Sequence, residues 1–289
     1  MLEQWVNICS KFFSKLPLEC MQYGFMQYAL LAIIFLAPLT AAAGVQVVNF
    51  RMAFFADTVG HSVFAGAALG ILIAGANAPV WSMPLFAVLI GIGVLSLKKC
   101  AGQSSDTLIG VFFAFAVSLG LLLVSRIPHL AKLSQQFIFG DILTVSANDI
   151  LLLAVLNIIY AIFICRKFNP MLLAAVDEDL YKVKCRHTLF GDYLHIALLA
   201  LIVIFTVRIA GVLLAGALLI VPAATARNLA KTSGSMFVCS IAAGLISGVT
   251  GLLISAQEWA NVPAGAAIVM TNCIFFAASL PIKRFSNRH

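Results

Sequence analysis

Charged residues are scarce in this chain. They make up 10% of its 289 residues, whereas hydrophobic residues make up 62%. Soluble domains carry about 25% charged residues, so the composition excludes an ordinary soluble domain and indicates an integral membrane protein. The apolar segments approach the ~20 residues that a helix needs to cross a bilayer. They therefore predict transmembrane helices, and not the weak ten-residue alternation of an outer-membrane barrel.

Several sequence motifs are also missing. The chain contains no Gly-Lys dipeptide, so it lacks the GxxxxGK[ST] loop that cradles nucleotide phosphates. Its seven cysteines form no CxxC pair, which favours free thiols over a metal cluster or a disulfide framework. The net charge of +7 comes without a basic run interleaved with aromatics, so nucleic acid is not an expected partner. If ATP drives this protein, another polypeptide must bind the ATP.

The order of polar and apolar segments predicts an all-α, polytopic membrane protein. Polar and bulky apolar residues alternate over residues 1–22, which predicts a short interfacial amphipathic helix. Nine apolar segments follow, and only residues 208–211 separate the sixth from the seventh. No polar linker divides them, so residues 23–289 form a single transmembrane domain. The predicted spans are residues 24–49, 52–76, 81–97, 106–125, 149–165, 192–209, 210–226, 235–256 and 263–282.

The distribution of basic residues favours one orientation. With the N-terminus outside, the outer segments hold only five of the 18 Lys and Arg residues, namely Lys11, Lys15, Arg126, Lys132 and Arg208. Cytoplasmic loops carry the excess of Lys and Arg in membrane proteins. We therefore expect an outside N-terminus, a cytoplasmic C-terminus and an odd number of spans, nine in preference to eight.

Two ionisable residues interrupt the second apolar segment, MAFFADTVGHSVFAGAALGILIAG. Asp57 and His61 are four positions apart, which places both on the same face of a helix. Counted from Arg51 at the inner interface, they lie ~9 Å and ~15 Å inside the membrane at 1.5 Å per residue. A carboxylate in hydrocarbon costs at least ~2.5 kcal/mol, so such residues normally face a bundle interior, a water-filled path or a bound ion.

The chemistry of this pair suits a metal ion. Carboxylate oxygen and imidazole nitrogen are ligands for Zn²⁺ and, less selectively, for Mn²⁺ or Fe²⁺. The alternative is that Asp57 and His61 hydrogen-bond only to each other or to a neighbouring helix.

Other polar residues in the chain carry weaker signals. Asp106 is expected in the first turn of a helix, and Ser146 or Asn148 can cap the helix that follows Asp141. Glu258 and Asn261, in AQEWANVPAG, lie at an outer helix junction where a path can open, although a solvated loop explains them equally well. The lone histidines near the interfaces are better explained by local structure than by a site; they are His129, His187 and His195.

A cytoplasmic segment offers a surface for a soluble partner. In PAATARNLAKTSGSM we expect the helix to break at Pro222, and a short Ala-rich surface helix with Arg227 and Lys231 to follow. Such a helix is a docking element, and its alternative is a plain connecting turn. The inside loop RKFNPMLLAAVDEDLYKVKCR is long enough for a further surface helix.

Four ordered motifs resemble one family, the membrane permease subunits of ATP-binding-cassette importers for zinc and manganese. The likeness is closest to the zinc-uptake permeases. The motifs are FRMAFFADTVGHSVFAGAALG, DTLIGVFFAFAVSLGLLLVS, FIFGDILTVSANDI and GVLLAGALLIVPAATARNLAKT. Because AVDEDLYKVKC and NVPAG also fit, the resemblance covers nearly all of the chain after residue 24.

The resemblance implies a transport subunit, not an enzyme, in the bacterial cytoplasmic (inner) membrane. It implies a permease homodimer that works by alternating access, two cytoplasmic ATPase subunits that bind the ATP, and an extracytoplasmic metal-binding protein. No cofactor is bound permanently, and Zn²⁺ or Mn²⁺ is the transported ion. By motif, Asp57 and His61 match the pair that contacts this ion. The region that presses on the ATPase matches Pro222, Ala224, Arg227 and Lys231.

One position departs from the family pattern. Asn261 stands where many relatives have an aspartate, and an amide oxygen binds a dication less strongly than a carboxylate does. Asn261 is therefore a weaker third ligand than an aspartate, and Glu258, one helical turn earlier, is the alternative ligand.

Three other functions are compatible with the pair. An ion-coupled secondary transporter would use Asp57 and His61 as a relay and would move metal without an ATPase. An intramembrane metalloenzyme would need a third ligand and a general base such as the glutamate of HExxH, and neither is evident. A permease for metal chelates, such as siderophores or cobalamin, would not need the pair. One carboxylate and one imidazole do not determine whether the transported ion is Zn²⁺, Mn²⁺ or Fe²⁺.

Overall fold

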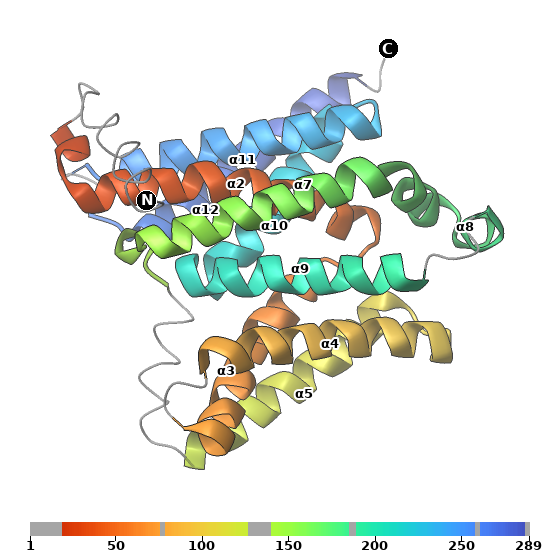
Figure 1. The fold of residues 1–289 in the computed structure, drawn as a ribbon. Helices are drawn as coiled ribbons and strands as arrows, with labels where there is room; N and C mark the ends of the chain where they lie inside the picture. Colours follow the sequence, from red (N-terminus) through yellow and green to blue (C-terminus); the bar gives the residue numbers. More distant parts are fainter. Residues whose placement is uncertain (1–18, 76–78, 127–139, 185–188, 258–260, 287–289) are drawn as a thin grey trace.

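The computed structural model describes residues 19–75, 79–126, 140–184, 189–257 and 261–286 (Figure 1). Nine helices in these ranges are long and apolar enough to cross a membrane, which confirms the predicted all-α fold. They are α2 (Gly24–Asn49), α3 (Phe55–Ala74), α4 (Pro79–Ala101), α5 (Ser105–Arg126), α7 (Ala147–Val176), α9 (Leu189–Ala210), α10 (Val212–Leu229), α11 (Ser233–Ser255) and α12 (Ala264–Ser286). Three short elements accompany them: η1 (Glu19–Gln22), η2 (Ile142–Thr144) and α8 (Glu178–Lys184).

Most of the amphipathic helix predicted over residues 1–22 lies outside the described residues. Its last four residues, Glu19–Gln22, form the 3₁₀ helix η1. The interfacial role of residues 1–22 therefore stays a prediction.

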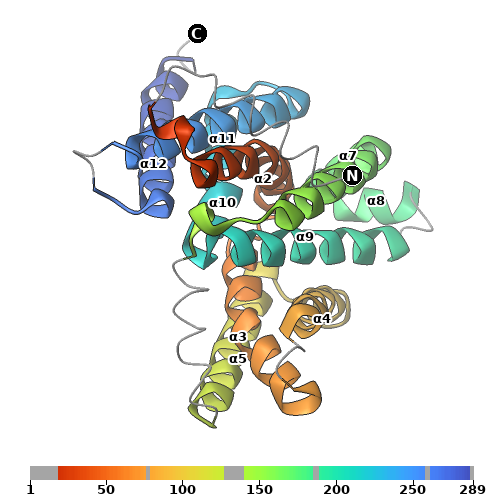
Figure 2. The ribbon, with the colours of Figure 1, turned by 60° about the vertical axis from the view of Figure 1, so that its left-hand side comes forward.

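The helices form two groups (Figures 1 and 2). In the first group α3 packs against α4 and α5, and in the second α2, α10, α11 and α12 pack on one another, with α7 against α2. Helix α9 lies between the groups and contacts α4 on one side and α10 on the other. Helix α3 also reaches α10, and we call this contact between the two groups the seam.

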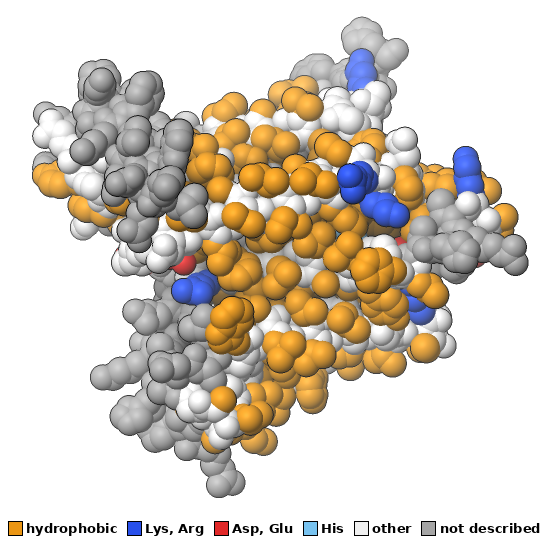
Figure 3. Space-filling view, in the orientation of Figure 1, with side chains coloured by type: hydrophobic (Ala, Val, Ile, Leu, Met, Phe, Trp, Pro, Cys, Tyr) orange, Lys and Arg blue, Asp and Glu red, His pale blue; other side chains and the backbone are white. Residues whose placement is uncertain are grey.

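The two ends of the bundle differ in charge. We call the end that carries α8 the α8 end; α4 and α7 finish there and α9 begins there. In Figure 3, Lys and Arg side chains gather over this end, while hydrophobic side chains cover the middle of the molecule. An apolar middle is what a bilayer requires, because lipid offers no hydrogen bonds and the helices must satisfy their own backbone.

A few buried side chains hydrogen-bond between helices. Ser240 Oγ on α11 donates to the carbonyl oxygen of Ala41 on α2 at 3.0 Å, and Ser247 Oγ donates to Asn272 Oδ1 on α12 at 2.8 Å. Asn157 Nδ2 on α7 donates to the carbonyl oxygen of Phe35 on α2 at 2.8 Å. Such bonds are worth about 0.6 kcal/mol each on average in membrane proteins, so they orient the helices and leave most of the association to close packing.

Small residues allow the close packing within the second group. A Cβ atom at Gly44 would overlap the carbonyl oxygen of Leu219, so the backbones of α2 and α10 touch at this point. On α11, a Cβ atom at Gly248 would lie 2.8 Å from Ile33 Cγ2, and one at Gly244 would lie 3.3 Å from Ala41 Cβ. The pair Gly244 and Gly248 therefore serves ordinary packing against α2, as its spacing predicts.

Five of the described helices continue through a proline, contrary to the sequence prediction at Pro222. Helix α10 continues through Pro222 to Leu229, so the expected break and the separate surface helix are wrong. Pro222 is buried, and a Cβ atom at Gly244 of α11 would lie 3.5 Å from its ring. Packed transmembrane helices tolerate a missing backbone bond because their neighbours hold them in place. Helix α7 likewise runs through Pro170 to Val176, well beyond the predicted end at residue 165.

The connections between helices agree better with the sequence. Gly211 alone joins α9 to α10, with φ at +83°, a conformation that favours glycine. Ser146 caps α7, and Asp149 completes the capping box by accepting a hydrogen bond from the Ser146 backbone at 3.2 Å. Asp106 lies in the first turn of α5, as expected.

The Gly44 contact predicts a specific loss of stability. Gly44→Ala should lower the free energy of unfolding by about 1–3 kcal/mol, because the new methyl group meets backbone that cannot move aside. Gly110→Ala on α5 is the matched control, since no atom lies within 4 Å of a Cβ there. Thermal unfolding of the purified variants in detergent measures the difference. Equal midpoints for the two variants would contradict the close approach of α2 and α10.

Candidate functional site

Asp57 lies in the first turn of α3, where the helix dipole favours a carboxylate. The helix begins at Phe55, and Arg51 before it is in a turn with φ at +55°. The depths predicted for Asp57 and His61 assumed a helix that is unbroken from Arg51. They are wrong, because residues 50–54 are not helical and do not advance 1.5 Å each along a helix axis.

Gly216 on α10 gives a better measure of depth. A Cβ atom at Gly216 would lie 3.1 Å from Asp57 Oδ1, so the carboxylate faces α10 across the seam. At 1.5 Å per residue, Gly216 is about 6 Å from the start of α10 at Val212 and about 20 Å from its end at Leu229. Helix α5 gives the opposite measure, because Phe113, beside His61, is about 12 Å from the start of α5 at the α8 end and about 20 Å from its far end. The pair thus lies in the middle part of the bundle.

His61 lies one turn further along α3. Its ring meets Phe113 of α5 edge-on, with centroids 5.3 Å apart, and lies 6.0 Å from Phe64. Between the two ionisable residues, Gly60 packs against α10, since a Cβ atom there would lie 3.0 Å from Val212 Cγ1. Both ionisable side chains are half-buried.

Neither side chain uses its hydrogen-bonding capacity within the described part of the chain. No hydrogen bond joins Asp57 to His61, and neither bonds to a neighbouring helix, although each lies in the electrostatic field of the other. The lone pairs of the carboxylate, and one imidazole nitrogen, are thus available to a ligand.

The pair is an incomplete metal site by itself. Zinc in proteins usually has four ligands, yet the described residues contain no group of three His, Cys, Asp or Glu side chains that could hold a metal. Glu258 lies outside the described residues. Asn261 is exposed in the turn before α12, with φ at +42°, and it makes no hydrogen bond to Asp57 or His61 in the described structure.

The residues expected to contact an ATPase are only partly on the surface. Pro222 is buried and Ala224 is half-buried inside α10, so neither is an exposed contact. Arg227 and Lys231 are exposed at or just beyond the end of α10. Asn228 donates a hydrogen bond to Ser279 Oγ of α12 at 3.0 Å. This bond fixes the end of α10, which carries Arg227 and is followed by Lys231.

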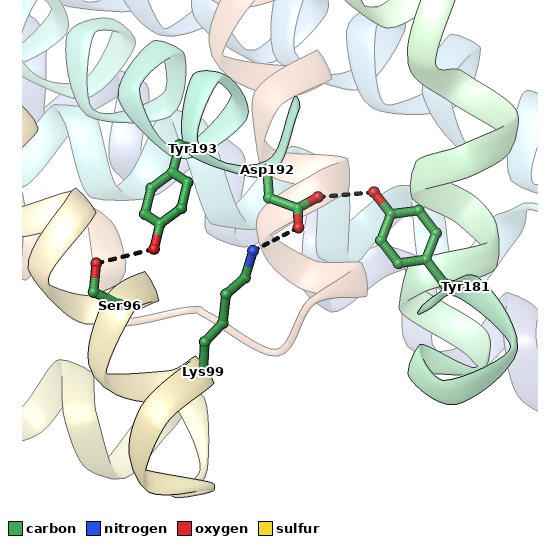
Figure 4. Close-up of polar contacts among 5 residues, drawn as sticks. All are labelled: Ser96, Lys99, Tyr181, Asp192 and Tyr193. Carbon is green, nitrogen blue, oxygen red and sulfur yellow. Dashed lines mark hydrogen bonds and ion pairs between the residues drawn. The ribbon is translucent and has the colours of Figure 1, made fainter. Parts of the chain in front are cut away.

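The structure also shows a polar network that sequence reasoning missed (Figure 4). Lys99 Nζ on α4 lies 2.8 Å from Asp192 Oδ2 on α9, and Tyr181 of α8 donates to Asp192 Oδ1 at 2.8 Å. Ser96 and Tyr193 join α4 and α9 one turn away, at 3.2 Å. Because 93 residues separate Lys99 from Asp192, no local pattern indicates the pairing. The network ties α4, α8 and α9 together at the α8 end.

His195 is the second feature that the sequence did not reveal. It was expected to be a histidine of local structural role, and it is buried between Phe163 and Phe50, with its ring stacked on Phe163 at 5.7 Å. His129 and His187 lie outside the described residues.

Nine helices of the described residues are long and apolar enough to cross a membrane, so the fold is that of a polytopic membrane protein. The chain belongs to the ABC 3 transport family, which it matches over residues 22–283.

Curated relatives and a solved structure agree with this family. The chain is 31% identical to the high-affinity zinc uptake system membrane protein ZnuB of Haemophilus influenzae, over 87% of this chain and 95% of that protein. It is 30% identical to the manganese import system permease protein ScaB of Streptococcus parasanguinis, over 93% and 95%. The structure of PsaBC from Streptococcus pneumoniae in complex with Fab superposes with a TM-score of 0.74 at 27% identity, covering 96% of this chain and 95% of that one.

The missing hydrogen bonds at the pair predict how single substitutions affect stability. Asp57→Asn and His61→Ala should leave the membrane abundance and the thermal midpoint unchanged or slightly higher, because neither removes a bond on which the partner depends. Asn272→Ala is a positive control, since it removes the acceptor of the buried Ser247 bond and should cost about 1 kcal/mol. Immunoblots of membranes and thermal unfolding give both readouts. A loss of abundance in Asp57→Asn as large as in Asn272→Ala would identify a structural pair.

Proposed function

We propose that this chain is the membrane subunit of an ATP-driven importer for a divalent metal ion, Zn²⁺ or Mn²⁺, and that Asp57 and His61 contact the ion in transit. The single observation that carries the site is a half-buried carboxylate at the seam with a half-buried imidazole one turn along α3, neither of which has a hydrogen-bond partner in the described structure. The family and the names of the relatives support the class of substrate.

The two side chains have complementary tasks. The Asp57 carboxylate attracts a dication into a region where charge is otherwise absent, and the missing side chain at Gly216 leaves room beside its oxygen. The His61 imidazole adds a nitrogen ligand of the kind that Zn²⁺ accepts readily. A site with only two strong ligands suits transit, because conduction requires binding that is favourable enough to enter and weak enough to leave.

The position of the pair supports alternating access in a homodimer. Asp57 is carried by the first helix group and faces the second, so a shift of one group against the other changes the space around the carboxylate. Such a shift can open the pair to one side of the membrane and then to the other. A second copy of the chain, or water, supplies the remaining ligands.

The charge of the two ends supports an orientation. Basic residues gather at the α8 end (Figure 3), so we assign this end to the cytoplasm and the N-terminus to the outside of the bacterial inner membrane. An extracytoplasmic metal-binding protein then delivers the ion at the opposite end.

A separate cytoplasmic ATPase binds the ATP, because this chain lacks a phosphate loop. Two elements offer it a docking surface at the α8 end: the exposed Arg227 and Lys231 beside the end of α10, and the short helix α8, which projects from the bundle in Figure 1. Pro222 and Ala224 support this surface from inside α10 and do not form it.

Uptake measurements test the role of the pair. Asp57→Asn and His61→Ala should each reduce the uptake of radiolabelled Zn²⁺ and Mn²⁺ at least about tenfold, since a dication at this depth loses its main attraction or its nitrogen ligand. Asp106→Asn is the matched control: the same change at the start of α5 should leave uptake unchanged.

The double variant Asp57→Leu with His61→Leu separates the transport role from a structural one. It should fold and stay inactive. Recovery of uptake in this double variant would remove both residues from the path of the ion. Uptake by the chain in the absence of any ATPase would instead indicate an ion-coupled secondary transporter.

Charge reversal tests the docking surface. Arg227→Glu should weaken copurification of the ATPase, or uncouple its hydrolysis from uptake, because Arg227 is exposed and its reversal costs little in folding. Arg208→Glu, at the opposite end of the bundle, is the control and should keep the ATPase bound. Affinity purification of the complex, followed by hydrolysis and uptake assays, distinguishes the two. Wild-type association and coupling in Arg227→Glu would exclude this residue from docking.

A further inference from the structure

A cavity of about 630 Å³ opens at the α8 end, apart from the Asp57 and His61 pair. Its walls come from the last turns of α4, the second half of α7, Tyr181 of α8 and the first turns of α9. Figures 1 and 2 show α9 running between α7 and α4, so the cavity lies where these three helices diverge.

The polar part of the lining is cationic. Three lysines line the cavity (Lys98, Lys99 and Lys167) against a single carboxylate, Asp192. Lys99 and Tyr181 already occupy both oxygens of Asp192 (Figure 4). Lys167 is half-buried and has no ion-pair partner in the described part of the chain. The cavity therefore favours an anion.

The start of α9 adds to this preference. Leu189 and Gly191, in the first turn of this 22-residue helix, line the cavity, and Lys167 Nζ lies 3.8 Å from where a Cβ atom of Gly191 would be. The first backbone N–H groups of a helix have no partner within the helix and bind anions such as phosphate. A lysine and a helix N-terminus thus meet at one point of the cavity wall.

His195 supplies independent evidence for a ligand. Its residue is 8% exposed, it lines the cavity, and neither ring nitrogen has a hydrogen-bond partner in the described structure. Buried polar atoms are nearly always satisfied, so two orphaned nitrogens on one ring require an explanation. An imidazole carries at least one N–H donor in every protonation state. Both ring nitrogens are covered by protein in this structure, so the ring has to turn toward the cavity before an anionic oxygen can accept from it.

The rest of the lining is apolar and selects the kind of anion. Aromatic and aliphatic side chains form the floor; they are Phe50, Met52, Val94, Leu95, Phe163, Met171 and Ile196. A free phosphate ion gains nothing from such a floor, and the volume is several times what it needs. A divalent metal is disfavoured by the three lysines and by the absence of a three-ligand group among the described residues.

We propose that this cavity binds the phosphate headgroup of an anionic membrane phospholipid, with Lys167, the first turn of α9 and His195 on the phosphate and the acyl chains against the apolar floor. Basic pockets between transmembrane helices on the cytoplasmic side are a recurrent form of lipid recognition. A bound lipid holds the ends of α4, α7 and α9 together beside the network in Figure 4. The proposal is independent of the transported ion.

Lipid-dependent stability tests this site. The full-length chain is purified and placed in nanodiscs of phosphatidylcholine with increasing phosphatidylglycerol, and the thermal midpoint is measured. The midpoint of the wild type should rise with phosphatidylglycerol. The Lys167→Gln variant should need about tenfold more phosphatidylglycerol for the same rise, because it loses one charge-assisted hydrogen bond to the phosphate. His195→Phe keeps the ring volume and should show the same shift without a lower midpoint in pure phosphatidylcholine.

Arg166→Gln is the matched control, because Arg166 is exposed, precedes Lys167 on α7 and does not line the cavity. It should respond to phosphatidylglycerol as the wild type does. An identical response of the wild type and Lys167→Gln, or an equal loss in Arg166→Gln, would overturn the site. Stabilisation in detergent by inorganic phosphate alone, abolished by Lys167→Gln, would overturn its assignment to a lipid. Stabilisation by Zn²⁺ that His195→Phe removes would identify a metal site instead.

Discussion

Lipid offers no hydrogen bonds, and most of this structure follows from that constraint. Every backbone group within the bilayer must find a partner in its own helix, so the chain folds into long apolar helices that pack through small residues. Near the helix ends, the ion pair between Lys99 and Asp192 joins α4 to α9 and the bond from Asn228 to Ser279 joins α10 to α12, while the capping box at Ser146 satisfies the start of α7 itself. Against this background, a buried polar group without a partner is informative.

Only a few buried or half-buried polar side chains in the described structure lack a partner, and three of them mark two separate places. Asp57 faces α10 at the contact between the two helix groups, and His61 lies one turn along α3 against Phe113 of α5. His195 lies near the α8 end, in a cavity with a cationic lining. The Asp57 carboxylate favours a cation, whereas the lysines that line the cavity near His195 favour an anion. The proposed ion site and the proposed lipid site therefore lie apart in one membrane domain and do not compete for the same residues.

The sequence predicts the spans well because hydrocarbon selects for length and apolarity, and both can be counted along the chain. It also identifies Asp57 and His61, since an ionisable residue stands out in an apolar segment. It fails at Pro222, where burial against α11 holds a helix that proline would end in water. The sequence around Gly216 does not indicate a role for this residue, because its contact with the Asp57 carboxylate arises only when α10 packs against α3. The ion pair between Lys99 and Asp192 is likewise not predictable, because the two residues are 93 positions apart and meet only when α4 packs against α9.

The single residue between α9 and α10 has a further consequence for the outer surface. With Gly211 as the whole connection, two helices turn back on each other without exposing a loop. The connection between these two helices therefore offers no loop of its own to a soluble protein. A residue inserted here would move α9 away from α10, the helix whose Gly216 lies beside the Asp57 carboxylate.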